Sequence, residues 1–235
     1  MARSAAPHAD NLIGIGLYTP AEAGKLVGVS PAKIIRWLRG HGAGDRRYDP
    51  LWRPQVDLGE DGIFLGFRDL QEVRVAAAFI DKGLSPQRVR QAIALARDLI
   101  AEERPLSTTR FRTDGRSVFL QVIEDDGQTK LIDLFRNQFA FREIIESSLT
   151  NLDYDEAGLP KMWWPLGRVK SVVIDPKRSF GQPIEAETSV PTGRLAAAVK
   201  SEGSAEAAAR AWAVPLRAVK RAVEFERRMT FRTAA

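Results

Sequence analysis

The chain has no cysteine among its 235 residues. This excludes disulfide bonds, thiolate nucleophiles and zinc sites with cysteine ligands together. Its two histidines, His8 and His41, lie among turn-forming residues, so histidine triads and HExxH zinc sites lack their residues. No apolar run reaches the roughly 18 residues of a membrane-spanning helix, and the first residues lack the apolar segment of a secretory signal. We therefore expect a cytoplasmic protein with no membrane association, metal or cofactor.

Hydrophobic residues make up 44% of the chain and charged residues 28%, which is typical of a globular protein. The net charge of +5 is unevenly distributed. Residues 1–100 carry 14 basic against 11 acidic residues, residues 101–165 carry 8 against 12, and residues 166–235 carry 13 against 7. This alternation indicates separate functional segments, with an anionic partner at one or both ends of the chain.

Two short helices are predicted near the N-terminus. A capping box at 19–22 begins the first, which ends at Gly28. Ser30, followed by a proline, begins the second, which ends near Leu38. Two helices joined by a turn of about three residues form a helix-turn-helix.

The second of these helices has two distinct faces at 100° per residue. Its apolar arc contains Ile34, Trp37 and Leu38. Its opposite arc is cationic and contains Lys33, Arg36 and Arg39. A recognition helix in the major groove needs this arrangement, with cations free for phosphates and base edges. A solvated basic face on a surface helix is the alternative interpretation.

A stretch rich in glycine, aspartate and proline follows at 42–62, before a short strand-like segment at 63–65. It contains the cations Arg46, Arg47 and Arg53. We expect a β-hairpin wing that presents arginine to the DNA backbone or the minor groove. Two further amphipathic helices are predicted, from about residue 68 to Gly83 and from Ser85 to about Ile100, and we assign their apolar stripes to core packing.

The segment from Tyr18 to Pro31, the basic helix, the wing and the sequence from Phe67 to Pro86 resemble the DNA-binding domain of MerR-type regulators over about residues 17–98. In that family the groove helix and the wing contact DNA. The resemblance implies this role for Lys33, Arg36, Arg39, Arg46 and Arg47, with Arg53 as a third wing cation. We expect a flexible leader at 1–17 and a winged helix-turn-helix domain at 18–103.

The middle segment, 104–167, is predicted to be a β-meander followed by a helix and a tryptophan-rich linker. Residues 107–134 alternate as strands do, and Asp-Gly pairs at 114–115 and 126–127 are typical of hairpin turns. The three acids at 124–126 are interpreted as a solvated hairpin tip rather than a metal site. A helix is expected over 139–149, and the Trp-Trp-Pro sequence at 163–165 is expected to dock one domain on another.

The last segment, 168–235, is predicted to be a small trihelical domain that resembles a helix-turn-helix. A strand at 172–174 and a turn at 175–183 precede helix starts near Thr192, Ser204 and Pro215. Its basic residues include Arg217, Lys220 and Arg221. They either contact DNA or face water on the surface of the packed helical domain, and the periodicity of the sequence leaves both interpretations open.

A second resemblance covers about residues 170–226. The Phe-Gly-Gln-Pro sequence at 180–183 and the helix start at 203–206 resemble a small bacterial domain found in antitoxins beside PIN-like ribonuclease toxins. Together with the MerR-like head, this tail resembles the long VapB-type antitoxins. The resemblance implies an antitoxin of a type II system that neutralises a PIN-like (VapC-type) toxin and represses its own operon. The implied partners are operator DNA, a second copy of the chain and the toxin.

PIN-type active sites are, as that resemblance implies, acidic clusters that bind magnesium, and an inserted cation would displace the metal. The residues expected to bind the toxin are Arg228, Phe231 and Arg232. The fold expected for the whole chain is α+β and mainly helical. A MerR-like regulator that responds to a small ligand and has no toxin partner is the alternative. An enzyme is the weakest reading, since no Walker sequence, nucleophile elbow or complete dinucleotide fingerprint is present.

Overall fold

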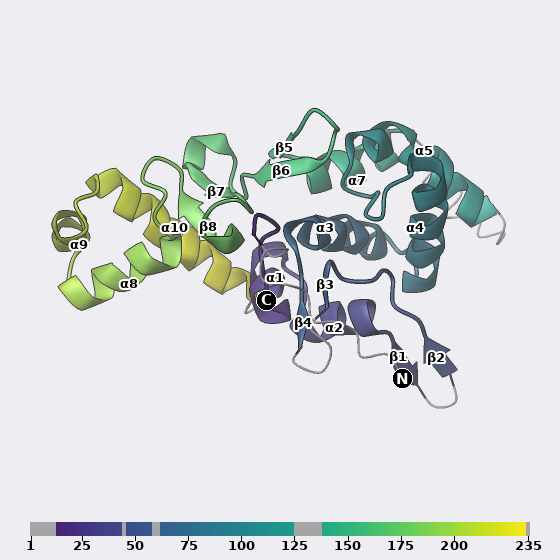
Figure 1. The fold of residues 1–235 in the computed structure, drawn as a ribbon, viewed down its shortest axis with the longest axis horizontal. Helices are drawn as coiled ribbons and strands as arrows, with labels where there is room; N and C mark the ends of the chain where they lie inside the picture. The colour runs from purple at the N-terminus through teal and green to yellow at the C-terminus, as the bar shows by residue number, and fades with distance from the viewer. Residues whose placement is uncertain (1–12, 44–45, 58–61, 125–137, 234–235) are drawn as a thin grey trace.

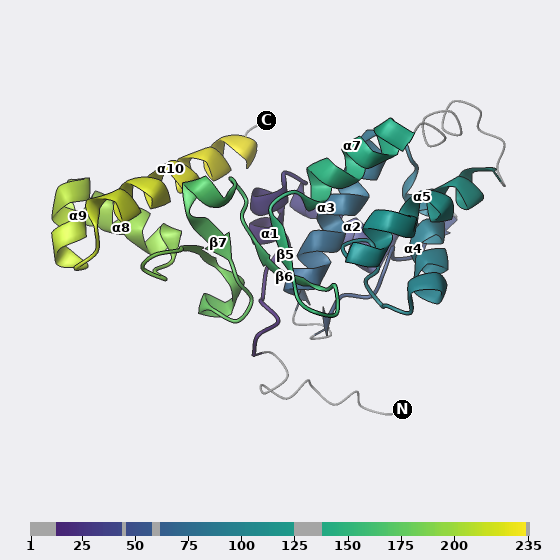
Figure 2. The ribbon, with the colours of Figure 1, turned by 90° about the horizontal axis from the view of Figure 1, so that it is seen from above.

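The computed structural model describes residues 13–43, 46–57, 62–124 and 138–233. The fold is α+β and mainly helical, as expected. It is elongated, with a larger helical lobe that begins at α1 (Pro20–Val27) and a smaller lobe that ends with α10 (Leu216–Thr233) (Figure 1). Seen from above, α10 runs from the smaller lobe back towards α1 (Figure 2).

The first two helices form as the capping residues predict. The Thr19 side chain accepts a hydrogen bond from the Glu22 amide, the Glu22 carboxylate accepts one from the Thr19 amide, and α1 ends at Gly28 with φ +76°. Ser30 caps α2 (Pro31–Arg39) by accepting a hydrogen bond from the Lys33 amide. A side chain at φ +76° would be strained, so glycine suits the tight turn between the helices.

The stretch after α2 contains two short antiparallel hairpins rather than one wing. β1 (His41–Ala43) pairs with β2 (Arg46–Tyr48), and β3 (Val56–Asp57) pairs with β4 (Ile63–Phe64). α3 (Phe67–Asp81) and α4 (Pro86–Ile100) follow, close to the predicted positions.

The predicted meander at 107–134 is wrong over its first half, because residues 109–124 form helix α5 (Thr109–Glu124). Its buried side chains include Phe111, Val118 and Phe119, which recur at helical spacing. The Phe119 ring stacks on Phe79 of α3, with their centroids 4.0 Å apart. These distant aromatic contacts override the local β-propensity of the sequence. The Asp-Gly pair at 126–127 and the acids at 125–126 lie outside the described residues.

Gly115, in the first of the predicted hairpin turns, lies within α5 and faces the ring of Phe111. A Cβ at this position would lie 2.7 Å from that ring. The glycine therefore allows a close approach of the ring to the helix backbone rather than a turn. The following helix, α7 (Gln138–Leu149), agrees with the predicted helix at 139–149.

A four-stranded antiparallel meander does exist, but it lies further along the chain. Its strands are β5 (Leu152–Tyr154), β6 (Pro160–Trp163), β7 (Val172–Ile174) and β8 (Pro183–Glu185), in that order. Short 3-10 helices, η3 (Arg168–Lys170) and η4 (Ser179–Gly181), flank β7. The strand predicted at 172–174 is confirmed.

The last three helices are α8 (Thr192–Glu202), α9 (Ala205–Ala211) and α10, so the trihelical prediction is confirmed. They share a small core centred on Leu195, Ala208 and Val219. The far part of α10 inserts Phe225 and Met229 into the main core of the protein.

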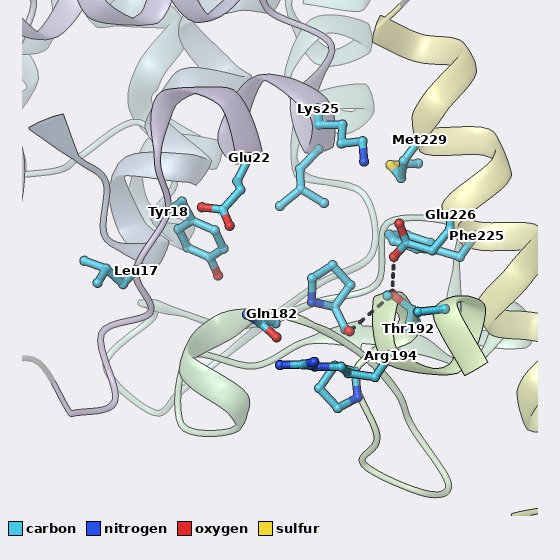
Figure 3. A pocket seen from close by; sticks show the side chains of 15 residues that line it. Leu17, Tyr18, Glu22, Lys25, Gln182, Thr192, Arg194, Phe225, Glu226 and Met229 are labelled. Carbon is cyan, nitrogen blue, oxygen red and sulfur yellow. Dashed lines mark hydrogen bonds between the residues drawn. The ribbon is translucent and has the colours of Figure 1, made fainter. Parts of the chain in front are cut away.

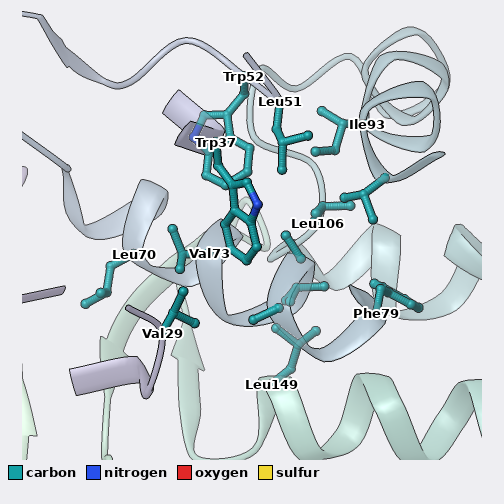
Figure 4. Packing of buried hydrophobic residues seen from close by; sticks show 14 of the residues in the cluster. Val29, Trp37, Leu51, Trp52, Leu70, Val73, Phe79, Ile93, Leu106 and Leu149 are labelled. Carbon is teal, nitrogen blue, oxygen red and sulfur yellow. The ribbon is translucent and has the colours of Figure 1, made fainter. Parts of the chain in front are cut away.

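The main core is continuous from Tyr18 to Met229 and includes residues of all three predicted domains (Figure 4). Trp163 is buried in it, and the Arg74 guanidinium of α3 lies 4.0 Å from the centre of its ring. The tryptophan therefore docks the sheet onto the helical lobe. Leu17, in the expected leader, donates its amide to the carbonyl of Phe180. The predicted domain boundaries stay a prediction.

Candidate nucleic-acid interface

The apolar face of α2 fixes the helix on the large lobe. Ile34, Trp37 and Leu38 are all buried. Figure 4 shows the Trp37 side chain between Trp52 and Val73, so α2 packs on the segment after the first hairpin and on α3. A helix held in this way leaves its opposite face free for contact with another molecule.

The opposite face carries the three cations that the sequence singled out. Arg36 and Arg39 are exposed, and neither guanidinium forms a hydrogen bond or ion pair with any residue that the structure describes. The Lys33 side chain is 36% exposed, with its Nζ 4.0 Å from an Asp81 carboxylate oxygen. It also lies 5.4 Å from the centre of the Trp37 ring. Because solvent screens the long contact with Asp81, the Lys33 ammonium group remains available for contact with another molecule.

The predicted wing cations lie on the first hairpin and in the loop that follows it. Arg47 and Arg53 are exposed, and within the described ranges their guanidinium groups have no hydrogen-bond or ion-pair partner. Arg46 belongs to β2, where it pairs with Ala43, and its side chain lies outside the described part of the chain.

The first hairpin is held against α4 by Arg90, which sequence analysis did not single out. The Arg90 Nε donates to the Pro50 carbonyl at 3.0 Å, and its Nη2 donates to the Asp49 carbonyl at 2.6 Å. Within the hairpin, the His41 and Tyr48 rings stack with centroids 4.8 Å apart. A shallow groove of about 280 Å³ separates these residues from Arg36 on α2. The hairpin and α2 therefore have a defined relative position.

A second missed residue, Asp69, fixes the segment that carries Arg53. Asp69 is fully buried and accepts hydrogen bonds from the Trp52 indole at 3.2 Å, the Gln55 amide at 2.6 Å and the Arg104 Nε at 2.5 Å. The Arg104 Nη2 in turn donates to the Arg53 carbonyl at 3.0 Å. These hydrogen bonds tie the segment from Trp52 to Gln55 to α3. The sequence signal for Asp69 was an acid in the first turn of α3.

Glu72, in the second turn of α3, is buried and accepts hydrogen bonds from the Ser107 amide and hydroxyl, at 3.1 and 3.0 Å. Burial raises the pKa of Glu72 to about 7, although these hydrogen bonds and the charge of Arg68 oppose the rise. The residue ties α3 to the segment that directly precedes α5. Its sensitivity to pH therefore bears on stability rather than on a binding contact.

The cations of the trihelical lobe are paired with acids of the same lobe. Arg217 pairs with Glu187, and Arg221 donates to the buried carboxylate of Glu185 at 3.1 Å. Lys220 lies 3.9 Å from Glu206. Of the two readings left open by periodicity, these contacts favour the one in which the cations balance local acids.

The residues expected to bind a toxin lie at the end of α10. Arg228 is exposed and donates to Glu224 at 2.6 Å on the same helix. The hydrogen bonds from Arg228 and Arg227 lower the pKa of Glu224. The side chains of Phe231 and Arg232 lie outside the described part of the chain.

The Phe-Gly-Gln-Pro sequence forms the joint between the two lobes. The Tyr18 hydroxyl donates to the Gly181 carbonyl at 2.8 Å, across 163 residues of sequence. Gly181 has φ +80°, and a Cβ there would collide with the Tyr18 hydroxyl. Glycine is therefore required both by the backbone angle and by the close approach of the tyrosine.

Beside this joint, a cleft of about 450 Å³ lies between α1 and the small lobe (Figure 3). Glu22 and Lys25 line it on the α1 side, and Arg194 and Glu226 line it on the other. The Thr192 hydroxyl donates to Glu226 at 2.6 Å at its floor. Within the described ranges, no three His, Asp or Glu side chains approach one another closely enough to hold a metal ion.

No family model matches the sequence. A curated protein of Mycobacterium tuberculosis (strain ATCC 25618 / H37Rv), named "Putative antitoxin VapB45", is 29% identical over 192 residues, which cover 72% of this chain and 77% of the relative. The crystal structure of Rv2018 from Mycobacterium tuberculosis superposes with a TM-score of 0.70 at 24% identity, over 90% of this chain and 99% of that one. The two chains share a fold. None of the helices in the described ranges combines the length and apolar sequence needed to cross a membrane.

Proposed function

We propose that the protein is the antitoxin of a type II toxin–antitoxin system. In this proposal it binds operator DNA, represses its own operon and neutralises a PIN-like (VapC-type) ribonuclease toxin in the cytoplasm, without catalysis of its own. The observation that carries the DNA-binding part is the pair of exposed arginines, Arg36 and Arg39, on a helix whose other face is buried. The name of the VapB45 relative supports the antitoxin part.

The DNA contacts follow from the charge and size of α2. The helix enters the major groove, where Arg36 and Arg39 contact guanine edges and phosphates and Lys33 contacts a phosphate. Arg46, Arg47 and Arg53 contact the flanking backbone or minor groove. A homodimer places two such helices about 34 Å apart, so the operator is an inverted repeat.

Toxin binding is assigned to the end of the chain. Arg228 forms an exposed pair with Glu224, and solvent screens the attraction within such a pair. Arg228 can therefore exchange Glu224 for a carboxylate of the toxin at little cost. Phe231 and Arg232 supply an apolar anchor and a second cation in this proposal. The complex is a hetero-oligomer of toxin and antitoxin.

Co-expression with the adjacent toxin gene tests the proposal. We expect the two proteins to co-purify, growth arrest by the toxin to be relieved, and the purified chain to retard a fragment of its own promoter. Replacing Arg228 and Arg232 by glutamate should abolish toxin neutralisation and leave promoter binding intact, because these substitutions keep Met229 in the main core. If the full-length chain neither retards the promoter nor captures the toxin, the proposed function is wrong.

A regulator that responds to a small ligand and has no toxin partner is the second candidate. It is favoured by a cavity of about 630 Å³ between the base of β3, α3 and the β5–β6 turn. Gln55, Arg68, Tyr154 and Lys161 are among the residues that line it. This volume lies in the range of small-molecule sites. Promoter binding without toxin capture would favour this candidate.

A further inference from the structure

The solvent-facing side of α2 carries apolar residues as well as cations. The exposed residues of the helix are Ala32, Ile35, Arg36 and Arg39, which recur at the spacing i, i+3, i+4 and i+7 of a single helical face. This face lies opposite the buried apolar face of the same helix. Lys33 is half-buried at its edge. A molecule that lies along α2 therefore meets two arginines together with an alanine and an isoleucine.

The isoleucine on this face is not explained by the fold. Ile35 is 37% exposed, although α2 already buries three other apolar residues. A β-branched residue also forms helix less readily than alanine or leucine does. Neither burial nor helix propensity therefore favours isoleucine at this position. Contact with another molecule would bury the part of the side chain that now faces water.

The charge and the position of α2 indicate duplex DNA as that molecule. The helix contains no acidic residue, and Arg36 and Arg39 have no ion-pair partner in the part of the chain that the structure describes. Asp81 of α3 lies beside Lys33, at the edge of the exposed face. In Figure 1, α2 lies on the opposite side of α3 from α7. An α-helix fits the major groove, where the C5 methyl group of thymine is accessible beside the polar base edges.

We propose that Ile35 determines sequence specificity by contacting the C5 methyl group of a thymine in the major groove. This role rests on the proposed DNA-binding function and adds an apolar contact to its cationic ones. Ala32, on the same face, is small enough to let the helix approach the base edges closely. Residues four apart on a helix are neighbours, so Arg39 lies next to Ile35. Each half-site of the operator therefore contains a thymine beside the guanine that Arg39 contacts.

Replacement of thymine by deoxyuridine tests this contact, because uracil pairs with adenine as thymine does but lacks the C5 methyl group. Footprinting first locates the operator in the promoter fragment, and each thymine is then replaced in turn. We expect one thymine position at which the unmodified chain loses about fourfold in affinity for each half-site, the contribution of one buried methyl group. Ile35→Ala should lower the affinity for the thymine operator by at least this factor. The variant should no longer distinguish the two operators.

Two controls separate this role from a loss of charge or of structure. Ile35→Ala should leave the slope of log affinity against log salt concentration unchanged, because it removes no cation. Its thermal midpoint should change little, because alanine is the better helix former at an exposed position. Val169→Ala is the matched variant, since Val169 is also an exposed β-branched residue, at 90% exposure, but lies on η3. It should keep the full sensitivity to the missing methyl group.

The outcomes distinguish the role of Ile35 from the function on which it rests. If the unmodified chain does not bind its promoter, the DNA-binding part of the proposed function fails, and the role of Ile35 fails with it. If the chain binds but no thymine methyl group affects its affinity, only the role of Ile35 is refuted. The same holds if Ile35→Ala keeps the sensitivity of the unmodified chain to deoxyuridine, since Ile35 would then act by positioning α2.

Discussion

Replacing both Arg36 and Arg39 by alanine should weaken DNA binding through a measurable change in its dependence on salt. Each cation that neutralises a phosphate contributes about 0.9 to the slope of log affinity against log salt concentration. A dimer loses four such contacts, so the slope should become shallower by roughly 3.6. Between 50 and 200 mM salt, the unmodified protein should then lose roughly a hundredfold more affinity than the variant does.

The same variant should fold normally, because neither guanidinium has a partner among the described residues. Its thermal midpoint should therefore match that of the unmodified chain. The matched control replaces Arg217 and Lys220, two exposed cations that pair with acids of their own lobe. Fluorescence anisotropy of a labelled promoter fragment at a series of salt concentrations measures both slopes. An unchanged slope for the α2 variant, or an equal change for the control, would refute the assignment of α2 to the DNA interface.

Three further predictions concern the buried Glu72, the joint between the two lobes and the anchorage of the first hairpin. The free energy of unfolding should fall by about 3 kcal/mol as the pH rises from about 4.5 to about 7, because the folded chain keeps a proton on Glu72 that the unfolded chain loses. Urea titrations at several pH values measure this fall, and Glu72→Gln should remove most of it. Gly181→Ala should lower the free energy of unfolding by about 2–4 kcal/mol. The loss should be smaller in a Tyr18→Phe background, where no hydroxyl meets the new methyl group. Equal losses in both backgrounds would contradict the close approach of the Tyr18 hydroxyl to Gly181. Arg90→Met should weaken promoter binding several-fold, because it removes the hydrogen bonds that hold the first hairpin against α4. The thermal midpoint should change little, because the core stays intact. Unaltered promoter binding would show that DNA binding does not depend on these hydrogen bonds.

The N-terminal helices could be predicted because their signals are local. Thr19 and Ser30 cap the helices that directly follow them, and Gly28 supplies the left-handed residue between the two. The cationic face of α2 follows from the helical repeat alone, once those boundaries are known.

Helix α5 could not be predicted in the same way. Its run of β-branched and aromatic residues alternates as a strand does, and an Asp-Gly pair resembles a hairpin turn. What decides the structure is the packing of Phe111 and Phe119 on Phe79 and Phe141, which come from other helices. Asp69 and Arg90, which hold the segments of the candidate interface in place, were missed by the sequence analysis for a related reason. The Arg104–Asp69 bond spans 35 residues and the bond from Arg90 to Asp49 spans 41, so no local pattern marks them.

The position of α1 determines how the two proposed binding activities relate to each other. α1 packs on α2, which carries the cations proposed to contact DNA, and it also contacts α10 of the small lobe. Tyr18, just before α1, bonds to Gly181 at the joint between the two lobes. A ligand at one site can influence the other only if it changes the free energy of such shared contacts. A perturbation at this joint should therefore distinguish two rigidly connected sites from two independent ones. If Gly181→Ala alters toxin affinity while promoter affinity stays constant, the joint positions the toxin-binding end of α10 alone. Parallel losses in both affinities would show that DNA binding depends on the same contacts.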